Sequence, residues 1–198
     1  MLASTSAAHM TARPSQASTT SVRPRYVLVS RSDAGEVAVQ SRIAASHRVV
    51  PSHFVDMDPS AAGLEHALVS LSGRPVGIIA IPYASCTDAI DPSWRRRIAG
   101  TVGTLRKRGF YVYAAAGNFG ANCSPRRQGT VFPASVRGVC AIAPRERSDP
   151  TGTYAALDSG SASVGKSSFI SSSAATGNAA FRGTPLIVIR NTSDCGVR

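Results

Sequence analysis

The sequence has little acidic charge, few aromatic residues and no long apolar run. Its 198 residues include 11 Asp and Glu against 22 Lys and Arg, which leaves a formal net charge of +11. No stretch approaches the 18 or so consecutive apolar residues of a transmembrane helix, so no membrane span is predicted. With 43% hydrophobic and 17% charged residues, the composition is typical of a globular chain and excludes a largely disordered one.

Cysteine is also scarce, and its spacing excludes the common zinc motifs. The chain has four cysteines, namely Cys86, Cys123, Cys140 and Cys195, and they form no CxxC pair. We therefore predict no metal site and no cofactor. The same cysteines would form one or two disulfides if the chain is exported.

The excess of positive charge raises the question of an anionic partner. Arginine is scattered along the chain except for two clusters, Arg95–Arg97 and Arg106–Arg108, which fall on one predicted helix. Clusters of this kind are typical of a solvated helix face. We therefore predict that nucleic acid is not a partner.

Residues 1–24 differ in composition from the rest of the chain. They are rich in Ser, Thr and Ala, contain no Asp or Glu, and lack the apolar run of a secretory signal peptide. An organelle transit peptide and a plain disordered leader both have this composition, and we favour the leader. Residues 25–198 are then the folded domain, and no localisation is predicted.

From residue 25 onward, apolar strand-like runs alternate with helical segments. The predicted strands are Tyr26–Ser30, Phe54–Met57, Val76–Ile81, Phe110–Ala115, Val136–Ala143 and Leu186–Ile189, and residues 144–165 are predicted to be loop. Helices are predicted over 36–45 and after Asp58-Pro59 and Asp91-Pro92, where Asp would be the N-cap and Pro the first helical residue. This alternation predicts an α/β fold of three layers, with a mostly parallel sheet and helices on both faces.

Small residues and an asparagine follow the predicted strand Phe110–Ala115. Ligands of parallel sheets bind beyond the carboxyl ends of the strands, and Asn118 lies just past such an end. Its amide could donate a hydrogen bond to a developing oxyanion, with Ala116 and Gly117 allowing close approach. A tight Gly-Asn turn without any chemistry accounts for the same residues.

The segment Val76–Ile142 resembles the middle of a subtilisin-like serine peptidase (subtilase) domain. The shared order is an apolar strand, an amphipathic helix, a glycine, a second apolar strand ending in Ala-Ala-Gly-Asn, and then Phe132–Ser135 before a third strand. The resemblance implies a subtilisin-like fold, shortened relative to the family, and hydrolysis of peptide bonds in a peptide or protein substrate. It also implies that Asn118 is the oxyanion donor.

The same resemblance implies a nucleophilic serine at the start of a helix. The matching segment is Gly165–Phe169, in which Ser168 would be the nucleophile. Free N–H groups and the helix dipole stabilise negative charge at such a position. The segment departs from the family pattern because Lys166 is inserted and Ser167 replaces a threonine, and a Ser-rich loop is the plain alternative.

A nucleophilic serine needs a base that is held by a third group. Asp33–Gly35 resembles the family's aspartate segment, which would make Asp33 the orienting acid. In the other alignment, Gly35–Ala38 resembles the histidine segment with Ala34 in place of the histidine, and both the Asp and His segments are then missing. The general base is unassigned, since no matching context surrounds the four histidines, His9, His47, His53 and His66.

A second motif overlaps the predicted nucleophile. Residues 160–167 fit the P-loop pattern GxxxxGK[ST], in which Lys166 would neutralise phosphates and Ser167 would bind Mg²⁺. The preceding segment is a weak strand, and few residues follow the motif. Three hypotheses stand: a serine endopeptidase, a non-catalytic subtilisin-fold remnant or binding protein, and a P-loop nucleotide-binding protein.

Overall fold

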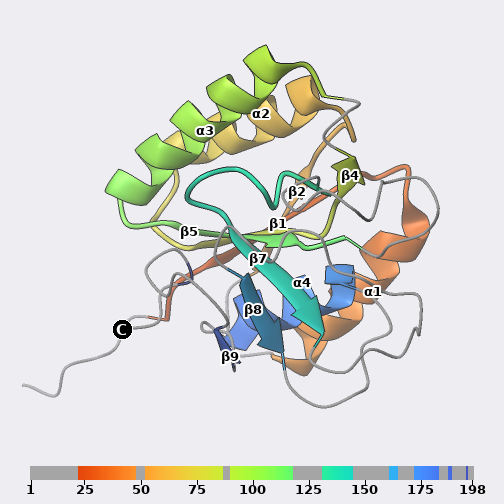
Figure 1. Cartoon of the computed structure of the whole chain (residues 1–198). Helices are drawn as coiled ribbons and strands as arrows, with labels where there is room; N and C mark the ends of the chain where they lie inside the picture. The colour runs from red at the N-terminus through yellow and green to blue at the C-terminus, as the bar shows by residue number, and fades with distance from the viewer. Residues whose placement is uncertain are drawn as a thin grey trace, which may run out of the picture.

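A computed structural model describes residues 22–47, 52–86, 90–117, 131–144, 161–164, 172–182, 187–188 and 195. These residues contain a seven-stranded sheet in the order β2-β1-β3-β5-β7-β8-β9. Its pairs are parallel except for β8 and β9, which are antiparallel. Helices cover both faces of the sheet (Figure 1). The prediction of an α/β fold with a mostly parallel sheet is confirmed.

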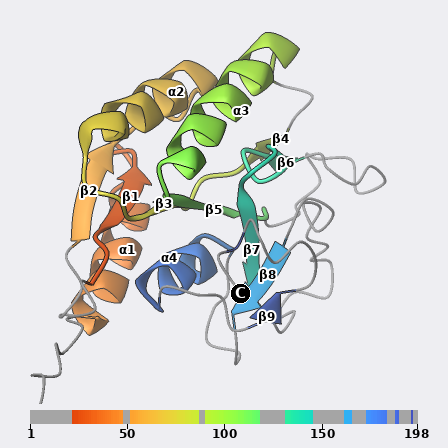
Figure 2. The same ribbon diagram turned by 90° about the vertical axis from the view of Figure 1, so that its left-hand side faces the viewer.

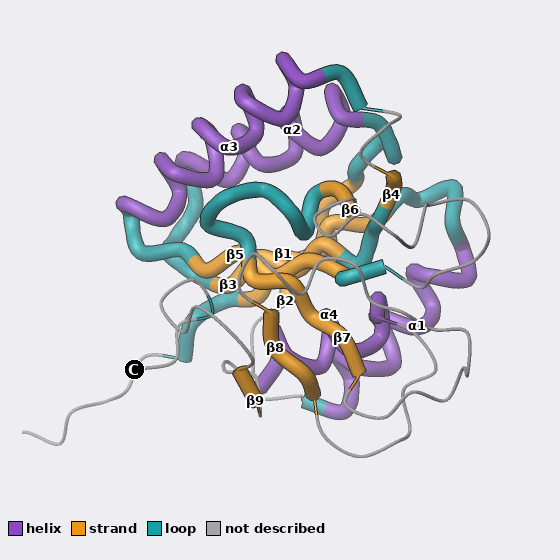
Figure 3. Tube along the Cα trace, in the orientation of Figure 1, coloured by secondary structure: helices purple, strands orange, loops and turns teal. Residues whose placement is uncertain are grey.

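The strands and helices have the following bounds. The strands of the main sheet are β1 (Arg25–Val29), β2 (Ser52–Asp56), β3 (Ile78–Ile81), β5 (Tyr111–Ala115), β7 (Cys140–Pro144), β8 (Ser161–Val164) and β9 (Ile187–Val188). A small antiparallel pair, seen in Figure 3, consists of β4 (Ser85–Cys86) and β6 (Val131–Phe132). The helices are α1 (Ala34–Ser46), α2 (Ala61–Ser70), α3 (Pro92–Lys107) and α4 (Ser172–Arg182), with a 3-10 turn over Leu71–Gly73. None of the described helices combines the length and apolarity that crossing a membrane requires.

The strands bury side chains on both faces of the sheet. In β1, Tyr26 and Leu28 belong to the apolar layer that includes α2 and α3, whereas Val27 and Val29 belong to the layer that includes α1 and α4. Figure 2 shows these two helix pairs on opposite sides of the sheet. Because successive side chains of a strand alternate between faces, a strand covered on both sides is apolar throughout, as the run 25–29 nearly is.

The direction in which strands are added reverses at β1. Helix α1 leads from β1 to β2 along one face, and α2 leads back past β1 to β3 along the other face. Right-handed crossovers in opposite directions require helices on opposite faces. The loops that follow β1 and β3 therefore leave the carboxyl edge toward opposite faces, and a crevice forms between these two neighbouring strands.

The two predicted Asp-Pro helix starts have different outcomes. Asp91 caps α3, since its carboxylate accepts a hydrogen bond from the Ser93 backbone N–H at 2.7 Å. The start predicted at Asp58-Pro59 is wrong, because the N-cap of α2 is Ser60, whose hydroxyl accepts from the Gly63 backbone N–H at 3.0 Å. A serine hydroxyl satisfies the first turn as well as an aspartate does, so the helix begins two residues later.

The loop predicted for residues 144–165 contains β8, and this overturns the P-loop hypothesis. Strand β8 pairs parallel with β7 and antiparallel with β9. Its sequence, Ser-Ala-Ser-Val, carries no apolar run, so pairing with its neighbours rather than local propensity makes it a strand. The four residues that would have to wrap around phosphate in the GxxxxGK[ST] pattern are therefore held in the sheet instead.

A disulfide ties the C-terminal region to the sheet. Cys140, the first residue of β7, is bonded to Cys195, and both are fully buried. The Tyr113 hydroxyl donates a hydrogen bond to the Cys195 carbonyl oxygen at 2.9 Å. Burial raises the pKa of Tyr113 above its ordinary value, so this hydroxyl keeps its proton at neutral pH. Cys86 is also disulfide-bonded, so each cysteine in the described part of the chain is oxidised.

Candidate functional site

A cavity of about 370 Å³ lies in the crevice between β1 and β3. Its lining combines apolar residues of β1 and the segment after β2 with polar residues from the loop after β1, the first turn of α1 and the segment after β3. The residues that matter for its chemistry are Leu28, Ser30, Asp33, Glu36, Met57 and Tyr83. A cavity at the carboxyl edge of a parallel sheet, at the point where the strand order reverses, is the usual place for a ligand in an α/β protein. We call it the switch-point cavity.

Asp33 lies in the wall of this cavity as the N-cap of α1. Its Oδ1 atom accepts a hydrogen bond from the Glu36 backbone N–H at 2.9 Å, and its own N–H donates to the Ser30 carbonyl oxygen at 3.0 Å. A carboxylate at this position satisfies a free N–H group and interacts favourably with the helix dipole. Asp33 therefore fixes the first turn of α1, which carries Glu36.

A buried glutamine holds the Glu36 side chain. The Gln40 side-chain amide donates to Glu36 Oε1 at 2.7 Å and to the Ser173 carbonyl oxygen of α4 at 3.0 Å. Gln40 is fully buried between the two helices. Gly177 permits the close approach, because a Cβ atom there would overlap the Gln40 amide. One amide group thus connects the Glu36 carboxylate to the first turn of α4.

Helix α4 begins nearer to the carboxyl edge of the sheet than it ends. Ser173, in its first turn, contacts the middle of α1, whereas Phe181 stacks on His47, the C-cap of α1, with ring centroids 5.8 Å apart. Because α1 itself starts at the carboxyl edge, directly after β1, the two helices start on the same side of the molecule. The N-terminus of α4 is therefore directed toward the edge that holds the switch-point cavity.

The strand that precedes the predicted oxyanion donor ends at the same edge. Residues 114–115 close β5, which neighbours β3. Gly117 has φ of +85°, and a Cβ atom there would come within 3.1 Å of the Val131 side chain, so backbone conformation and space both favour glycine. Asn118 and Ser168 themselves lie outside the described residues. Asp33 is the predicted site residue that the structure describes.

No described histidine lines the switch-point cavity. His47 stacks on Phe181, His53 stacks on Tyr26 with centroids 5.3 Å apart, and His66 lies in α2. Among the described residues, no group of three or more His, Cys, Asp or Glu side chains is arranged to hold a metal ion. The titratable side chains that the described residues contribute to the cavity are two carboxylates and one phenol, namely Asp33, Glu36 and Tyr83.

Sequence reasoning did not select Glu36 as a site residue. An acidic residue in the first turn is an ordinary helix-start signal, so its type alone indicates nothing more. The available signal was its spacing: Gln40 follows four residues later and is therefore on the same helix face. Only the position of α4 shows that this face is buried.

Gly177→Ala tests the contact between the two helices. Because the added methyl group would displace a buried, hydrogen-bonded amide, we expect the free energy of unfolding to fall by about 1–3 kcal/mol. The matched control is Gly100→Ala in α3, where a Cβ atom meets nothing within 4 Å and the substitution should stabilise the helix by about 1 kcal/mol. Chemical denaturation measures both, and equal effects at the two positions would contradict the contact. In a Gln40→Ala background, the cost of Gly177→Ala should disappear.

Comparisons with known proteins add little to this description. No protein-family model matches the sequence, and no curated protein matches it. Among solved structures, one described as "Crystal Structure of a Lanthipeptide Protease" is similar at 13% sequence identity and a TM-score of 0.49. The similarity covers 75% of this chain and 58% of that chain, so the present chain spans little more than half the length of that protein. The assignment of a function therefore rests on the residues themselves.

Proposed function

We propose that this chain is a serine peptidase of the subtilisin-like type, acting on a peptide or protein substrate. The observation that carries the proposal is the switch-point cavity, which has two carboxylates in its wall. Strand β5 ends at the same edge of the sheet, and the N-terminus of α4 is directed toward that edge. In sequence, Asn118 follows the end of β5 by three residues and Ser168 precedes the start of α4 by four. An oxyanion donor and a nucleophile at these positions would serve one cavity.

Glu36 is our assignment for the proton acceptor. The other two described titratable side chains of the cavity already have roles. The Tyr83 hydroxyl donates a hydrogen bond to the Pro59 carbonyl oxygen at 3.1 Å, and the Asp33 carboxylate caps α1. Gln40 binds one oxygen of the Glu36 carboxylate, which leaves the other oxygen for a proton. Asp33 then acts as the orienting acid, because its cap holds the turn on which Glu36 lies.

These roles give a complete reaction. The Ser168 hydroxyl oxygen attacks the scissile carbonyl carbon while its proton passes to Glu36, and the Asn118 amide donates a hydrogen bond to the resulting oxyanion. Glu36 then gives this proton to the leaving amine, and the C–N bond breaks to leave an ester on Ser168. Water attacks that ester and loses a proton to Glu36. Glu36 gives this proton to the Ser168 oxygen as the ester C–O bond breaks, which releases the carboxylic acid product and restores both residues.

Labelling with a fluorophosphonate probe tests the proposal. The folded parent chain should be labelled, Ser168→Ala should not be labelled, and Asn118→Ala should be labelled more slowly because the donor is lost. In subtilisin, removal of the equivalent donor lowers kcat by about 10²–10³. Ser167→Ala is the matched control and should be labelled like the parent.

Failure of the folded parent chain to react would end the peptidase proposal. The non-catalytic alternative, a peptide-binding protein of the same fold, would then be the better account, since the absence of a histidine from the described cavity wall favours it. Labelling that persists in Ser168→Ala but is lost in another serine variant would keep the enzyme class and reject the assigned nucleophile.

A further inference from the structure

A second cavity, of about 330 Å³, lies between α3 and the turn that follows β6. Helix α3 contributes Arg95, Arg96 and Ala99, and the turn contributes Ser135 and Arg137. None of the residues that line it also lines the switch-point cavity. Three arginines therefore line a hollow that the proposed peptidase reaction does not use, and we call it the arginine cavity.

The turn that forms one wall is fixed on α3. Gly138 has φ of +87°, and a Cβ atom there would lie 3.0 Å from Arg106 Cδ, so the turn packs directly against the helix. Arg106 also donates a hydrogen bond to the Gly138 carbonyl oxygen at 3.3 Å. Within the turn, the Ser135 N–H donates to the Val131 carbonyl oxygen at 2.8 Å. The wall that carries Ser135 and Arg137 is therefore formed before any ligand arrives.

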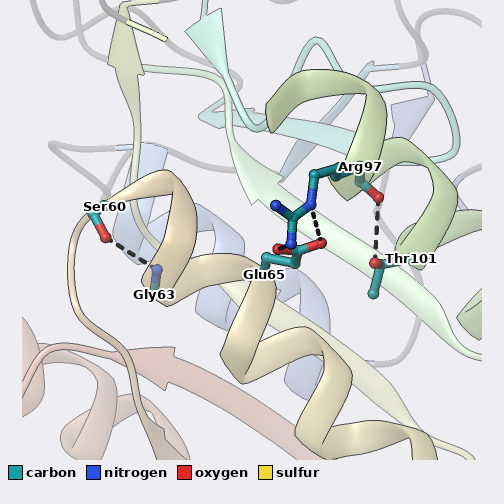
Figure 4. A network of polar contacts seen from close by, with 5 residues as sticks. All are labelled: Ser60, Gly63, Glu65, Arg97 and Thr101. Carbon is teal, nitrogen blue, oxygen red and sulfur yellow. Dashed lines mark hydrogen bonds and ion pairs between the residues drawn. The ribbon is translucent and has the colours of Figure 1, made fainter. Parts of the chain in front are cut away.

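The arginines of the cavity differ from their neighbour Arg97. Figure 4 shows Arg97 paired with Glu65 across α2 and α3, with a shortest distance of 2.7 Å. Arg97 also lies over the Trp94 ring at 4.4 Å from its centroid. In the described part of the chain, Arg95, Arg96 and Arg137 form no ion pair. No described carboxylate pairs with these three arginines, whereas the charge of Arg97 is already neutralised by Glu65.

One carboxylate lies close enough to act on this charge. The pKa of Asp91 is lowered, first by its hydrogen bonds with Ser93 and to a smaller extent by the charge of Arg96. Asp91 is thus ionised at neutral pH and offsets part of the positive charge near Arg96. It does not cancel the charges of the three arginines, so the part of the cavity lining that the structure describes keeps a net positive charge.

Ser135 adds an uncharged hydrogen-bonding group. Its hydroxyl is buried and finds no hydrogen-bond partner among the described residues. A buried hydroxyl without a partner is costly, and most such groups in proteins are paired with a protein atom, a water or a ligand. Ser135 lines the arginine cavity, and rotation of its side chain would bring the buried hydroxyl to a ligand oxygen there.

We propose that the arginine cavity binds a phosphate dianion, either inorganic phosphate or a phosphate monoester. Planar guanidinium groups bind phosphate oxygens with paired hydrogen bonds, and three of them can share a tetrahedral group. Three positive charges, partly offset by Asp91, match a doubly charged ligand better than a singly charged carboxylate or phosphodiester. This site is independent of the proposed peptidase activity.

Titration calorimetry of the full chain with inorganic phosphate at pH 8 and constant ionic strength tests the proposal. We expect saturable binding of one phosphate per chain, weakened about a hundredfold in Arg96→Gln/Arg137→Gln, since each of the two lost charge-assisted contacts is worth about tenfold. The matched control, Arg42→Gln/Lys107→Gln, removes two exposed charges elsewhere and should change the affinity less than twofold. Ser135→Ala should weaken binding several-fold without altering the charge.

Three results would overturn the proposal: no saturation by phosphate, equal losses in the two double variants, or equally tight binding of dimethyl phosphate, which carries a single charge. The last two would mean that overall positive charge, not a built site, attracts the anion. Titration with phosphoserine distinguishes the sources, because tighter binding than inorganic phosphate identifies a monoester as the ligand. Fluorophosphonate labelling of the same variants should remain unchanged, which separates this test from that of the peptidase.

Discussion

Glu36→Gln is expected to lower kcat/KM for a peptide substrate by about 10²–10⁴-fold, the range that a general base contributes. The substitution keeps the shape of the side chain and its capacity to accept the Gln40 hydrogen bond. It removes only the ability to take a proton from Ser168. Kinetics with a fluorogenic peptide measure the loss, and thermal unfolding of the variant should be close to that of the parent.

Glu65→Gln is the matched control for this prediction. Glu65 is also a helical glutamate, and it is paired with Arg97 on the opposite face of the sheet from α1. We expect its replacement to leave kcat/KM unchanged. Full activity of Glu36→Gln alongside an inactive Ser168→Ala would show that the peptidase proposal holds but that another group accepts the proton.

Loss of the Cys140–Cys195 disulfide should be the largest single effect on stability. The bond closes a loop of 55 residues, for which the chain-entropy model gives about 4 kcal/mol of stabilisation. Because both sulfur atoms are fully buried, Cys140→Ala/Cys195→Ala is preferable to a serine pair, which would bury two hydroxyl groups. We expect the free energy of unfolding, measured by urea denaturation, to fall by about 2–5 kcal/mol.

Tyr113→Phe separates the tether from the local packing around it. This variant keeps the disulfide but removes the hydrogen bond to the Cys195 carbonyl oxygen, at an expected cost of about 0.5–1.5 kcal/mol, the usual net contribution of one hydrogen bond. A smaller loss in the double alanine variant than in Tyr113→Phe would contradict a stabilising role of the disulfide. Peptide mapping under non-reducing conditions checks that the bond is present in the parent chain.

Local sequence was sufficient for most of the sheet and for one helix start. The predicted strands 76–81 and 110–115 contain β3 and β5, and the predicted strand 26–30 covers β1 except for Arg25, because a strand buried on both faces is apolar along most of its length. Asp91 was recognisable as a helix cap because its carboxylate can accept from a free N–H group of the first turn and Pro92 suits the first helical position. The same pair at 58–59 did not cap α2, whose N-cap is Ser60 instead. These features depend on interactions between residues near one another in the chain.

Tertiary structure alone decided where a site could form. Strand β8 exists because β7 and β9 pair with it, and its own four residues carry no such signal. The joining of Glu36 to α4 through Gln40 links residues 133 positions apart, which no local pattern encodes. The sequence by itself determined the α/β class, and its motifs predicted Asn118, Ser168 and Asp33 as candidate catalytic residues. The switch-point cavity and its two carboxylates depend on the loops that the reversal of strand order brings together. The arginine cavity depends on the packing of the turn after β6 against α3, and both are properties of the folded chain.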